Sequence, residues 1–398
     1  MQAKIILKDI PAGKFHSAVL TTYSIDLYFF EQQVLPLLGS KGVHYVSVLA
    51  DGGMLSKQLS GYSGLSERRR RNYALHGMQS NGAFHPKIIF LAGDRSLLLL
   101  IGSGNLTSAG HGKNLETWNA VYVDAPTDLR LGLLKEAWSF IQHLHQDLGK
   151  SALHKINTIA ENCDLLRNTN KSESQQKYAN GGNGALISFL GSQGIQSMFE
   201  QLKDAVGEQS VNQIHLMCPY YDVNGAFLHQ LEETFRPNKI NVILQEEFGM
   251  IPYKMKPLPN VRFYTWTGSQ KRDFKQSFFH TKHIIFEGSQ TNLMYTGSAN
   301  ASMAAFGGPG FREINTEAGL IYEKSNFDFF SHLEIELRND IQLVDLSIPA
   351  LAEPITGEAI LVYIKTAEKQ RNEVHFSFFS KQALTNVEVV LYGFGGKA

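Results

Sequence analysis

The sequence has few cysteines, no excess of either charge and no long hydrophobic run. Cys163 and Cys218 are its two cysteines, too few for a metal cluster or a disulfide framework, so a reducing compartment is expected. Lys and Arg together number 37, as do Asp and Glu, and any anion-binding surface must therefore be local. No segment approaches the roughly 18 apolar residues of a membrane span. Residues 1–17 are too polar for a signal peptide, which predicts a cytoplasmic protein without membrane contact.

A strand–helix–strand pattern occurs twice in the 398 residues, which is a length that accommodates two domains and an appendage. Apolar periodicity predicts strands over 15–22 and 43–50 with a helix over 25–38 between them. The pattern returns as a strand, a helix and a strand over 213–219, 223–235 and 239–245. Asp26 and Asp222 occupy corresponding places with an offset of 196 (222 − 26). A duplicated unit of this kind predicts an α/β architecture.

Changes in composition predict where the lobes end. Residues 167–184 lose their apolar periodicity and are polar and glycine-rich. We predict a first lobe over 1–150, a helical and polar linker over 151–184, and a second lobe over 185–340. Three further strand candidates lie at 357–365, 373–380 and 386–393. They predict a small β-rich module over 345–398 that docks a target or a protein partner such as an ATPase or helicase, and the oligomeric state stays open.

The chain carries one polar constellation in two copies. His85-Pro86-Lys87 is followed by Ser103-Gly104-Asn105, and His280-Thr281-Lys282 by Ser298-Ala299-Asn300. The offset is 195 for both elements (280 − 85 and 300 − 105). Each copy ends in an Asn-x-Glu element, at Glu116 and Glu317, displaced by 201 (317 − 116). The glycine-rich residues 307–310 account for this six-residue insertion as a loop.

The spacing within each copy predicts an antiparallel hairpin. Alternate residues of a strand share a face, so His85 and Lys87 point the same way. His85 and Ser103 are centred on residue 94, inside a turn-like stretch, and His280 and Ser298 on residue 289. We therefore expect each histidine to face its serine across the ladder. Each half would then gather an imidazole, an ammonium, a hydroxyl, an amide and a carboxylate of its own.

Two such sets fit the chemistry of a phosphodiester. Its negative charge must be stabilised, with a nucleophile on one side of phosphorus and a proton donor on the other. One neutral histidine would attack phosphorus, while the other would protonate the leaving oxygen and then activate water. We assign His85 as nucleophile and His280 as general acid, although the symmetry allows the reverse. The remaining groups bind phosphate or orient the rings: Lys87, Lys282, Ser103, Ser298, Asn105 and Asn300 for phosphate, Glu116 and Glu317 for the rings. This chemistry requires no metal or other cofactor.

These elements resemble the H-x-K, G-S-x-N and N-x-E motifs of the phospholipase D superfamily, over roughly residues 15–325. The resemblance implies an α/β fold with two pseudo-twofold-related lobes, each a mixed sheet flanked by helices, whose histidines meet at the interface. It also implies a metal-independent, two-step phosphodiester reaction through a phosphohistidine. The family pattern has an aspartate five residues after each lysine, where this sequence has Ala92 and Glu287. Tyrosyl-DNA phosphodiesterases also lack it, which favours the nuclease or tyrosyl-DNA-phosphodiesterase-like branch.

Basic residues precede both histidines and predict a local surface for a polyanionic backbone. They are Arg68, Arg69, Arg70 and Arg71 in the first half and Lys271, Arg272 and Lys275 in the second. A solvated helix face is the alternative interpretation of the arginine run. Nearby aromatic side chains would stack bases or, more ordinarily, pack in the core: Tyr73, Tyr264, Trp266 and Phe274.

Four functions remain open at this point. The first is a nuclease that cleaves DNA, less readily RNA, with standalone bacterial relatives suggesting restriction or antiviral defence. The others are tyrosyl-DNA-phosphodiesterase-like processing of DNA ends, a lipid phosphodiesterase or phosphatidyltransferase, and a non-catalytic nucleic-acid-binding module. His111 and Lys113 form another H-x-K pair without a G-S-x-N element after it, and His283 is expected to pack behind the strand rather than to pair with His280 as a metal ligand.

Overall fold

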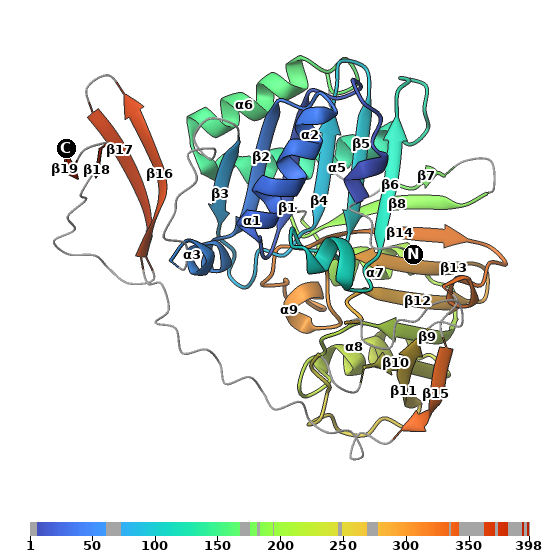
Figure 1. Cartoon of the computed structure of the whole chain (residues 1–398). Coiled ribbons are helices and arrows are strands. Elements are labelled where there is room, and N and C mark those ends of the chain that lie inside the picture. Colours follow the sequence, from blue (N-terminus) through green and yellow to red (C-terminus); the bar gives the residue numbers. More distant parts are fainter. Residues whose placement is uncertain are drawn as a thin grey trace.

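The computed structural model shows two mixed sheets flanked by helices, with two short β-ladders near the carboxyl end (Figure 1). It describes residues 6–60, 73–167, 176–180, 184–193, 195–245, 249–268, 278–333, 336–341, 362–370, 373–380, 392–393 and 396–397. Within these ranges no helix is long and apolar enough to cross a membrane.

The first sheet has six strands in the order β3-β2-β1-β4-β5-β6. The strands predicted over 15–22 and 43–50 are β1 and β2, which run parallel to each other and to β3. β4 joins β1 antiparallel, and β5 and β6 continue the antiparallel part. The bounds are β1 Ser17–Thr22, β2 Tyr45–Asp51, β3 Ala74–Met78, β4 Ile88–Ala92, β5 Leu97–Gly102 and β6 Trp118–Val123.

The second sheet repeats this order as β11-β10-β9-β12-β13-β14, with β15 added beside β11 and with β8 and β7 added beside β14. β9, β10 and β11 are parallel, whereas β12, β13 and β14 follow antiparallel. The repeat confirms the two-lobed α/β fold class. The bounds are β7 Tyr178–Ala179, β8 Leu186–Gly191, β9 Val211–Met217, β10 Lys239–Leu244, β11 Val261–Gly268, β12 His283–Gly288, β13 Asn292–Gly297, β14 Ala318–Lys324 and β15 Glu336–Ile341.

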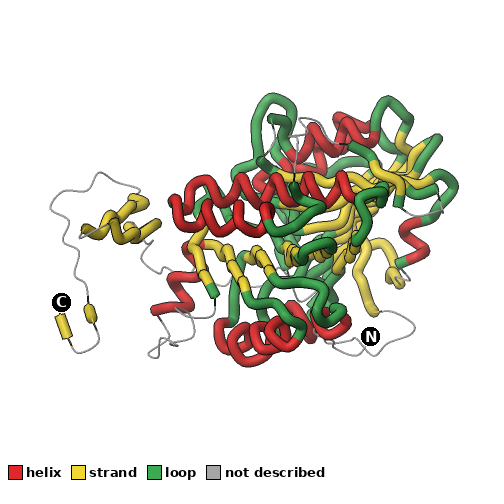
Figure 2. The backbone as a smooth tube through the Cα atoms, turned by 90° about the horizontal axis from the view of Figure 1, so that it is seen from above, coloured by secondary structure: helices red, strands yellow, loops and turns green. Residues whose placement is uncertain are grey.

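Helices cover the sheets because successive strand residues send apolar side chains to opposite faces. One face of the first sheet packs on α1, η2 and α2, and the other on α5 and α6. α7, α8 and α9 cover the second sheet, and Figure 2 shows helices on both sides of the strands. The bounds are η1 Ile6–Asp9, α1 Leu27–Phe29, η2 Phe30–Val34, α2 Leu35–Ser40, α3 Gly52–Ser60, η3 Ala109–Lys113, α5 Leu131–His145, η4 Gln146–Leu148, α6 Lys150–Glu161, α7 Met198–Val206, α8 Ala226–Phe235, α9 Met303–Phe306 and α10 Phe329–His332.

A continuous apolar cluster joins the two lobes. Leu99 and Ile101 of β5 belong to the same buried cluster as Ala318 and Leu320 of β14. Ile156 of α6 belongs to this cluster as well, so the first part of the predicted linker is a helix that packs in the core. The lobe boundaries at 150 and 185 stay predictions, whereas the packing makes the two sheets one structural unit around their contact.

Three local features differ from, or add to, the sequence prediction. The helix predicted over 25–38 is interrupted by the π-helical turn η2. The loop predicted at 307–310 contains Gly307 and Gly310 at φ +71° and +77°, a backbone region that glycine adopts without strain. At the carboxyl end β16 (Val362–Gln370) pairs antiparallel with β17 (Glu373–Ser380), and β18 (Tyr392–Gly393) with β19 (Gly396–Lys397).

Candidate active site

The motif residues lie just beyond the ends of buried strands, at corresponding places in the two sheets. His85 precedes β4, Ser103 follows β5 and Glu116 precedes β6; His280, Ser298 and Glu317 stand in the same way to β12, β13 and β14. The first-lobe strands between them are fully apolar and buried, so the polar groups occur where the strands end. This edge also receives the carboxyl ends of the parallel strands, where α/β proteins commonly bind ligands.

The predicted alignment of histidine and serine is wrong by one residue. The ladder pairs Ile88 with Ile101, and continued outward this register would set His85 opposite Gly104 rather than Ser103. The second hairpin pairs His283 with Thr296 and has the same shift. Both ladders end before the histidines, because the chain at each motif leaves its own sheet to contact the other lobe.

Main-chain hydrogen bonds between the lobes hold the two histidines at one place. The amide of His85 donates to the carbonyl oxygen of Thr316 at 2.9 Å, and that of His280 to Leu115 at 3.0 Å. Isolated bridges join Phe84 to Thr316 and Leu115 to Phe279. Each histidine segment therefore runs beside the segment that leads into the glutamate of the other half.

The carboxylates are consequently exchanged between the halves, contrary to the prediction that each half gathers its own. Nδ1 of His85 lies 3.0 Å from Oε2 of Glu317. Nδ1 of His280 lies 2.9 Å from both carboxylate oxygens of Glu116. A sequence offset reveals the repeat but does not reveal which copy supplies the partner, because that depends on how the lobes dock.

The serines and the asparagines of the N-x-E elements hold these carboxylates in place. Ser103 donates to Oε2 of Glu116 at 2.5 Å, and Ser298 donates to Oε2 of Glu317. Asn114 and Asn315 donate to the other oxygen of the same carboxylates, each at 3.1 Å. Both serine hydroxyls thus give their hydrogen to a glutamate, which is a different contact from the phosphate contact assigned from the sequence.

Both motif lysines are buried, with exposed fractions of 0%. Lys87 donates to the carbonyl oxygen of His85 at 2.6 Å, and Lys282 to that of His280 at 2.7 Å. Burial, reinforced by the charge of Lys282, lowers the pKa of Lys87 well below its ordinary value, and burial lowers the pKa of Lys282 to about 8. Two buried, mutually repelling ammonium groups favour the arrival of an anion.

The two glutamates remain ionised. Burial alone would raise the pKa of Glu116, but the hydrogen bond from His280, with Lys282 and Ser103, holds it below its ordinary value. Burial opposes ionisation of Glu317 as well, and His85, Lys87 and Ser298 together hold its pKa low. An ionised carboxylate accepts hydrogen bonds only, so it fixes the Nδ1–H tautomer of the imidazole that faces it.

Both histidines are neutral in the free protein. Burial, followed by the charge of Lys282, lowers the pKa of His280 to about 4. Burial also lowers the pKa of His85, in spite of the opposing effect of Glu317. With Nδ1–H committed to a glutamate, the lone pair is on Nε2 of each ring. In the second lobe Lys282 contacts that atom at 3.2 Å, so the two rings are not equivalent.

Asn105 and Asn300 retain unused hydrogen-bonding capacity. Oδ1 is buried in both, and in the described part of the chain it has no hydrogen-bond partner. A buried polar atom without a partner is costly. That the same atom is unpaired in both copies identifies these amides as groups that a bound molecule or water would satisfy.

Aromatic side chains beside the histidines were missed in the sequence. The Tyr23 ring lies 5.2 Å from that of His85 and 5.9 Å from Nζ of Lys87, while the Phe278 ring lies 5.2 Å from that of His280. Tyr220, 38% exposed, packs on Phe278 with centroids 6.3 Å apart. Tyr23 and Tyr220 follow β1 and β9 closely, and their position after the carboxyl ends of parallel strands is the signal that could have identified them.

Other candidates lie elsewhere. Tyr73 and Trp266 are 7% exposed and pack in apolar clusters, so the core interpretation holds for both, and Tyr264 accepts a hydrogen bond from Lys239. His283 contacts Thr117 across the lobe contact at 2.9 Å. The residues of both predicted basic patches, and Phe274, fall outside the described residues: Arg68, Arg69, Arg70, Arg71, Lys271, Arg272 and Lys275.

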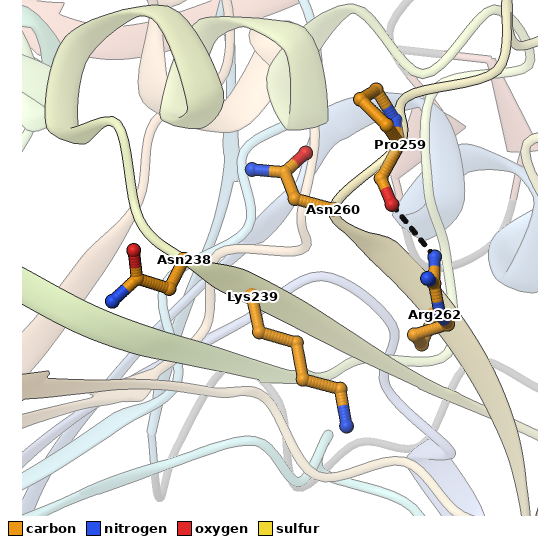
Figure 3. Close-up of a pocket in the computed structure, with 5 residues that line it drawn as sticks. All are labelled: Asn238, Lys239, Pro259, Asn260 and Arg262. Carbon is orange, nitrogen blue, oxygen red and sulfur yellow. Dashed lines mark hydrogen bonds between the residues drawn. The ribbon is translucent and has the colours of Figure 1, made fainter.

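A surface pocket lies apart from this constellation (Figure 3). Its lining comes from the segments that begin β10 and β11: Asn238, Lys239, Pro259, Asn260 and Arg262. Arg262 donates to the carbonyl oxygen of Pro259 at 2.8 Å, and Lys239 to the hydroxyl of Tyr264 at 2.7 Å. These strand starts are at the opposite end from the histidine edge, and none of the motif residues lines the pocket.

No family model and no curated protein matches the sequence, whereas solved structures share its fold. Yeast tyrosyl-DNA phosphodiesterase superposes with a TM-score of 0.53 at 13% identity, over 83% of this chain and 87% of that one. Phosphatidylserine synthase from Haemophilus influenzae superposes with a TM-score of 0.50 at 12% identity, over 86% of this chain and 85% of that one. Both are phospholipase D superfamily members, so the resemblance drawn from the motifs is confirmed at the level of the fold.

Proposed function

We propose that the chain is a phosphodiesterase that works through a covalent phosphohistidine and that its substrate is DNA. The observation that carries this proposal is the exchange of carboxylates: two neutral histidines, each held at Nδ1 by a glutamate of the other lobe. Beside them lie two buried lysines and two unpaired amide oxygens. The set offers two nitrogen lone pairs and a cationic lining, which is what displacement at an anionic phosphorus requires.

The first step uses the two rings differently. Nε2 of His85 attacks phosphorus, the bond from phosphorus to the leaving oxygen breaks, and that oxygen takes a proton from Nε2 of His280. His280 is neutral in the free protein, but the negative charge of the bound phosphodiester offsets the two lysines, whose charge lowers its pKa. Nε2 of His280 therefore takes up a proton from solvent when the substrate binds, and it returns a proton to solvent when the product leaves. Lys282 contacts Nε2 of His280 at 3.2 Å and engages its lone pair, which leaves Nε2 of His85 as the better placed nucleophile.

The second step regenerates the free protein. Water attacks phosphorus, gives a proton to Nε2 of His280, and the bond from phosphorus to His85 breaks with its electron pair returning to the ring. The ammonium groups of Lys87 and Lys282 and the amide N–H groups of Asn105 and Asn300 donate to the non-bridging oxygens. Glu317 and Glu116 keep the Nδ1–H tautomer of His85 and His280 through both steps.

DNA is the proposed substrate because basic residues precede both histidines in the sequence and because aromatic side chains flank both rings. Processing of a tyrosyl-linked DNA end is the second candidate, since the yeast neighbour is named a tyrosyl-DNA phosphodiesterase. It is favoured by the exposed Tyr220, which packs on Phe278 beside His280. We further propose that the protein acts in the cytoplasm in restriction or antiviral defence, with residues 345–398 docking a partner.

The test is a cleavage assay with EDTA present. Supercoiled, linear and single-stranded DNA are incubated with the purified protein, with phosphatidylcholine vesicles as the lipid comparison. We expect DNA cleavage without added metal and its loss in His280→Ala. Hydrolysis of the lipid alone, or undiminished DNA cleavage by the variant, would overturn the proposal.

A further inference from the structure

Two aromatic side chains, Phe278 and Tyr220, lie beside His280, the histidine that is proposed to protonate the leaving group. We call them the aromatic wall. The Phe278 ring lies 5.2 Å from that of His280 at an interplanar angle of 44°. Tyr220 packs edge-on against Phe278, with centroids 6.3 Å apart and an interplanar angle of 74°. The two rings therefore continue outward from the imidazole toward solvent, where Tyr220 is 38% exposed.

The backbone that carries Tyr220 is fixed. Tyr220 forms a parallel bridge with Met250, and the next residue, Tyr221, bridges to Ala301 directly after the Asn300 element. The amide of Tyr221 donates to Met250 at 3.0 Å. Tyr220 thus projects from a segment tied to the phosphate-binding motif, and its position relative to that motif is set by the fold.

Tyr23 lies beside the other histidine and approaches Tyr220. Its pKa is raised by burial, then by Asp51 and by Tyr220. Tyr23 is half-buried against His85 and Lys87. Aromatic side chains therefore flank both histidines, and the exposed one, Tyr220, lies on the His280 side.

An exposed aromatic side chain at this place is not explained by core packing. Tyr73 and Trp266 show the core pattern in this protein, with exposed fractions of 7% and apolar neighbours. Tyr220 keeps much of its ring available for a bound molecule. Aromatic rings attract a further ring in edge or offset geometry by more than the buried area alone.

The geometry of the displacement determines which part of the substrate contacts the aromatic wall. In an in-line displacement the nucleophile and the leaving oxygen lie on opposite sides of phosphorus. The group on the leaving oxygen therefore lies next to the general acid, and here next to Phe278 and Tyr220. We propose that Tyr220, with Phe278, is a specificity-determining wall that selects phosphodiesters whose leaving group carries an aromatic ring close to the phosphate.

This inference rests on the proposed function, and its chemistry has two sources: a tyrosyl side chain linked to DNA or the base of the departing nucleotide. Both present an aromatic ring on the leaving side, whereas aliphatic lipid alcohols do not. The wall therefore separates aromatic from aliphatic substrates without fixing which aromatic source is used.

The experiment compares two substrates that differ only in aromaticity, the benzyl and cyclohexylmethyl esters of thymidine 3′-phosphate. The ratio of their kcat/KM values is measured for the wild type, Tyr220→Leu, the ring-retaining Tyr220→Phe, and Tyr45→Leu. Tyr45 is 68% exposed at the start of β2, away from the histidine edge, and serves as the matched control. Dividing each variant's ratio by that of the wild type cancels the intrinsic reactivity of the alcohols.

We expect Tyr220→Phe and Tyr45→Leu to keep the wild-type ratio of benzyl to cyclohexylmethyl ester, and Tyr220→Leu to lower that ratio by about 2- to 12-fold. A Tyr220→Leu variant that keeps the wild-type ratio would overturn the inference while leaving the proposed function intact. Turnover of neither ester contradicts the proposed function instead. In that case the dissociation constants of benzyl phosphate and cyclohexylmethyl phosphate are measured by calorimetry for the wild type and Tyr220→Leu. The change in the ratio of the two constants between these proteins then tests the inference.

A second pair of substrates identifies the source of the ring. Thymidine 3′-phosphotyrosine and a thymidine dinucleotide are hydrolysed by the wild type and by Tyr220→Leu. If Tyr220→Leu lowers kcat/KM for the tyrosyl substrate alone, the ring that contacts the wall is the tyrosine of a DNA end. If the variant lowers kcat/KM for the dinucleotide, that ring is a base. No loss on either substrate contradicts the inference.

Discussion

The two lobes share a strand order and a motif, yet they hold their histidines in different electrostatic surroundings. In the first lobe the amide of Phe84 donates to the carboxylate of Asp51 at 2.9 Å; in the second the amide of Phe279 donates to the side-chain oxygen of Gln245 at 2.7 Å. One position thus carries a charge and its counterpart does not. Asp51 raises the pKa of Lys87, and no equivalent charge from residue 245 acts on Lys282.

The second difference concerns the lysines themselves. Lys282 contacts Nε2 of its own histidine at 3.2 Å, whereas Lys87 lies over the Tyr23 ring. A duplicated site that served one reaction with two steps would gain from such divergence, because one ring must give up an electron pair while the other handles a proton. The asymmetry therefore resides in the surroundings and contacts of the motif residues rather than in their identity.

The largest expected effect comes from removing either histidine. We expect His85→Ala and His280→Ala each to lower kcat on DNA by about 10⁴-fold or more, because the nucleophile and the proton donor act as a unit. The assay is single-turnover cleavage, with circular dichroism to verify that each variant is folded. Retention of more than a tenth of the activity by either variant would contradict the assignment.

The exchanged glutamates come next. Glu317→Gln removes the acceptor that fixes His85, and Glu116→Gln the one that fixes His280, so each is expected to lower kcat by about 10²- to 10⁴-fold. They should differ in one respect. The loss in Glu116→Gln should shrink when a p-nitrophenyl ester replaces an alkyl ester, because a good leaving group needs little protonation.

The loss in Glu317→Gln should be similar for both esters. If instead the leaving group altered the effect of Glu317→Gln and left that of Glu116→Gln unchanged, the roles of the two lobes would be reversed. The comparison therefore tests the exchange and the assignment of roles together.

The lysines predict a smaller, pH-dependent effect. The pKa of Lys282 is lowered to about 8 by burial, so its ammonium is present below that pH and is lost above it. KM for a phosphodiester should therefore rise by up to about tenfold per pH unit once the charge is lost, beginning above pH 8. A KM that stays constant to pH 10 would contradict a binding role for this charge.

Asp51→Asn should make the electrostatic surroundings of Lys87 more like those of Lys282. Without the carboxylate the pKa of Lys87 falls further, so the alkaline rise in KM should begin at lower pH, with a change in kcat of less than about tenfold. Gln245→Glu is the reciprocal variant and should shift the rise to higher pH. Equal profiles in both variants and the wild type would show that this difference between the lobes has no functional consequence.

The smallest effect on activity is expected at His111, whose ring packs between Phe29 and Trp118. Burial lowers its pKa to about 4, so the folded state excludes a proton that the unfolded chain binds below pH 6.5. Stability is then complete above pH 6.5 and is lost as the pH falls toward 4. His111→Phe should keep full activity and should retain about 2 kcal/mol more of its stability at pH 5. Chemical denaturation at pH 7 and pH 5 measures this, and a parallel loss in both proteins would contradict it.

The sequence predicts the repeat and the strand–helix–strand unit within each copy, because a constant offset between two copies in one chain is a strong internal signal. It does not predict that Glu317 serves His85, since that follows from the docking of two lobes. The one-residue shift at Ser103 and Ser298 has a similar origin, because the chain leaves the ladder at that point.

Tyr220 and Asp51 lie outside the motif and become neighbours of the site only through the tertiary structure. Tyr73 and Trp266 show the converse, since residues close to the motif in sequence lie in the core. Proximity along the chain is a weak guide to a site that is assembled from two lobes. The strand ends at which a residue occurs are the better guide.

The most direct test of the account is to trap the covalent intermediate in His280→Ala with a p-nitrophenyl ester of thymidine 3′-phosphate. The good leaving group needs no protonation, whereas hydrolysis of the phosphohistidine needs the missing base. We expect a burst of about one equivalent of p-nitrophenolate per protein molecule, with acid-labile, base-stable phosphate on His85 by peptide mapping. Steady turnover without an adduct, or phosphate on a residue other than His85, would contradict it.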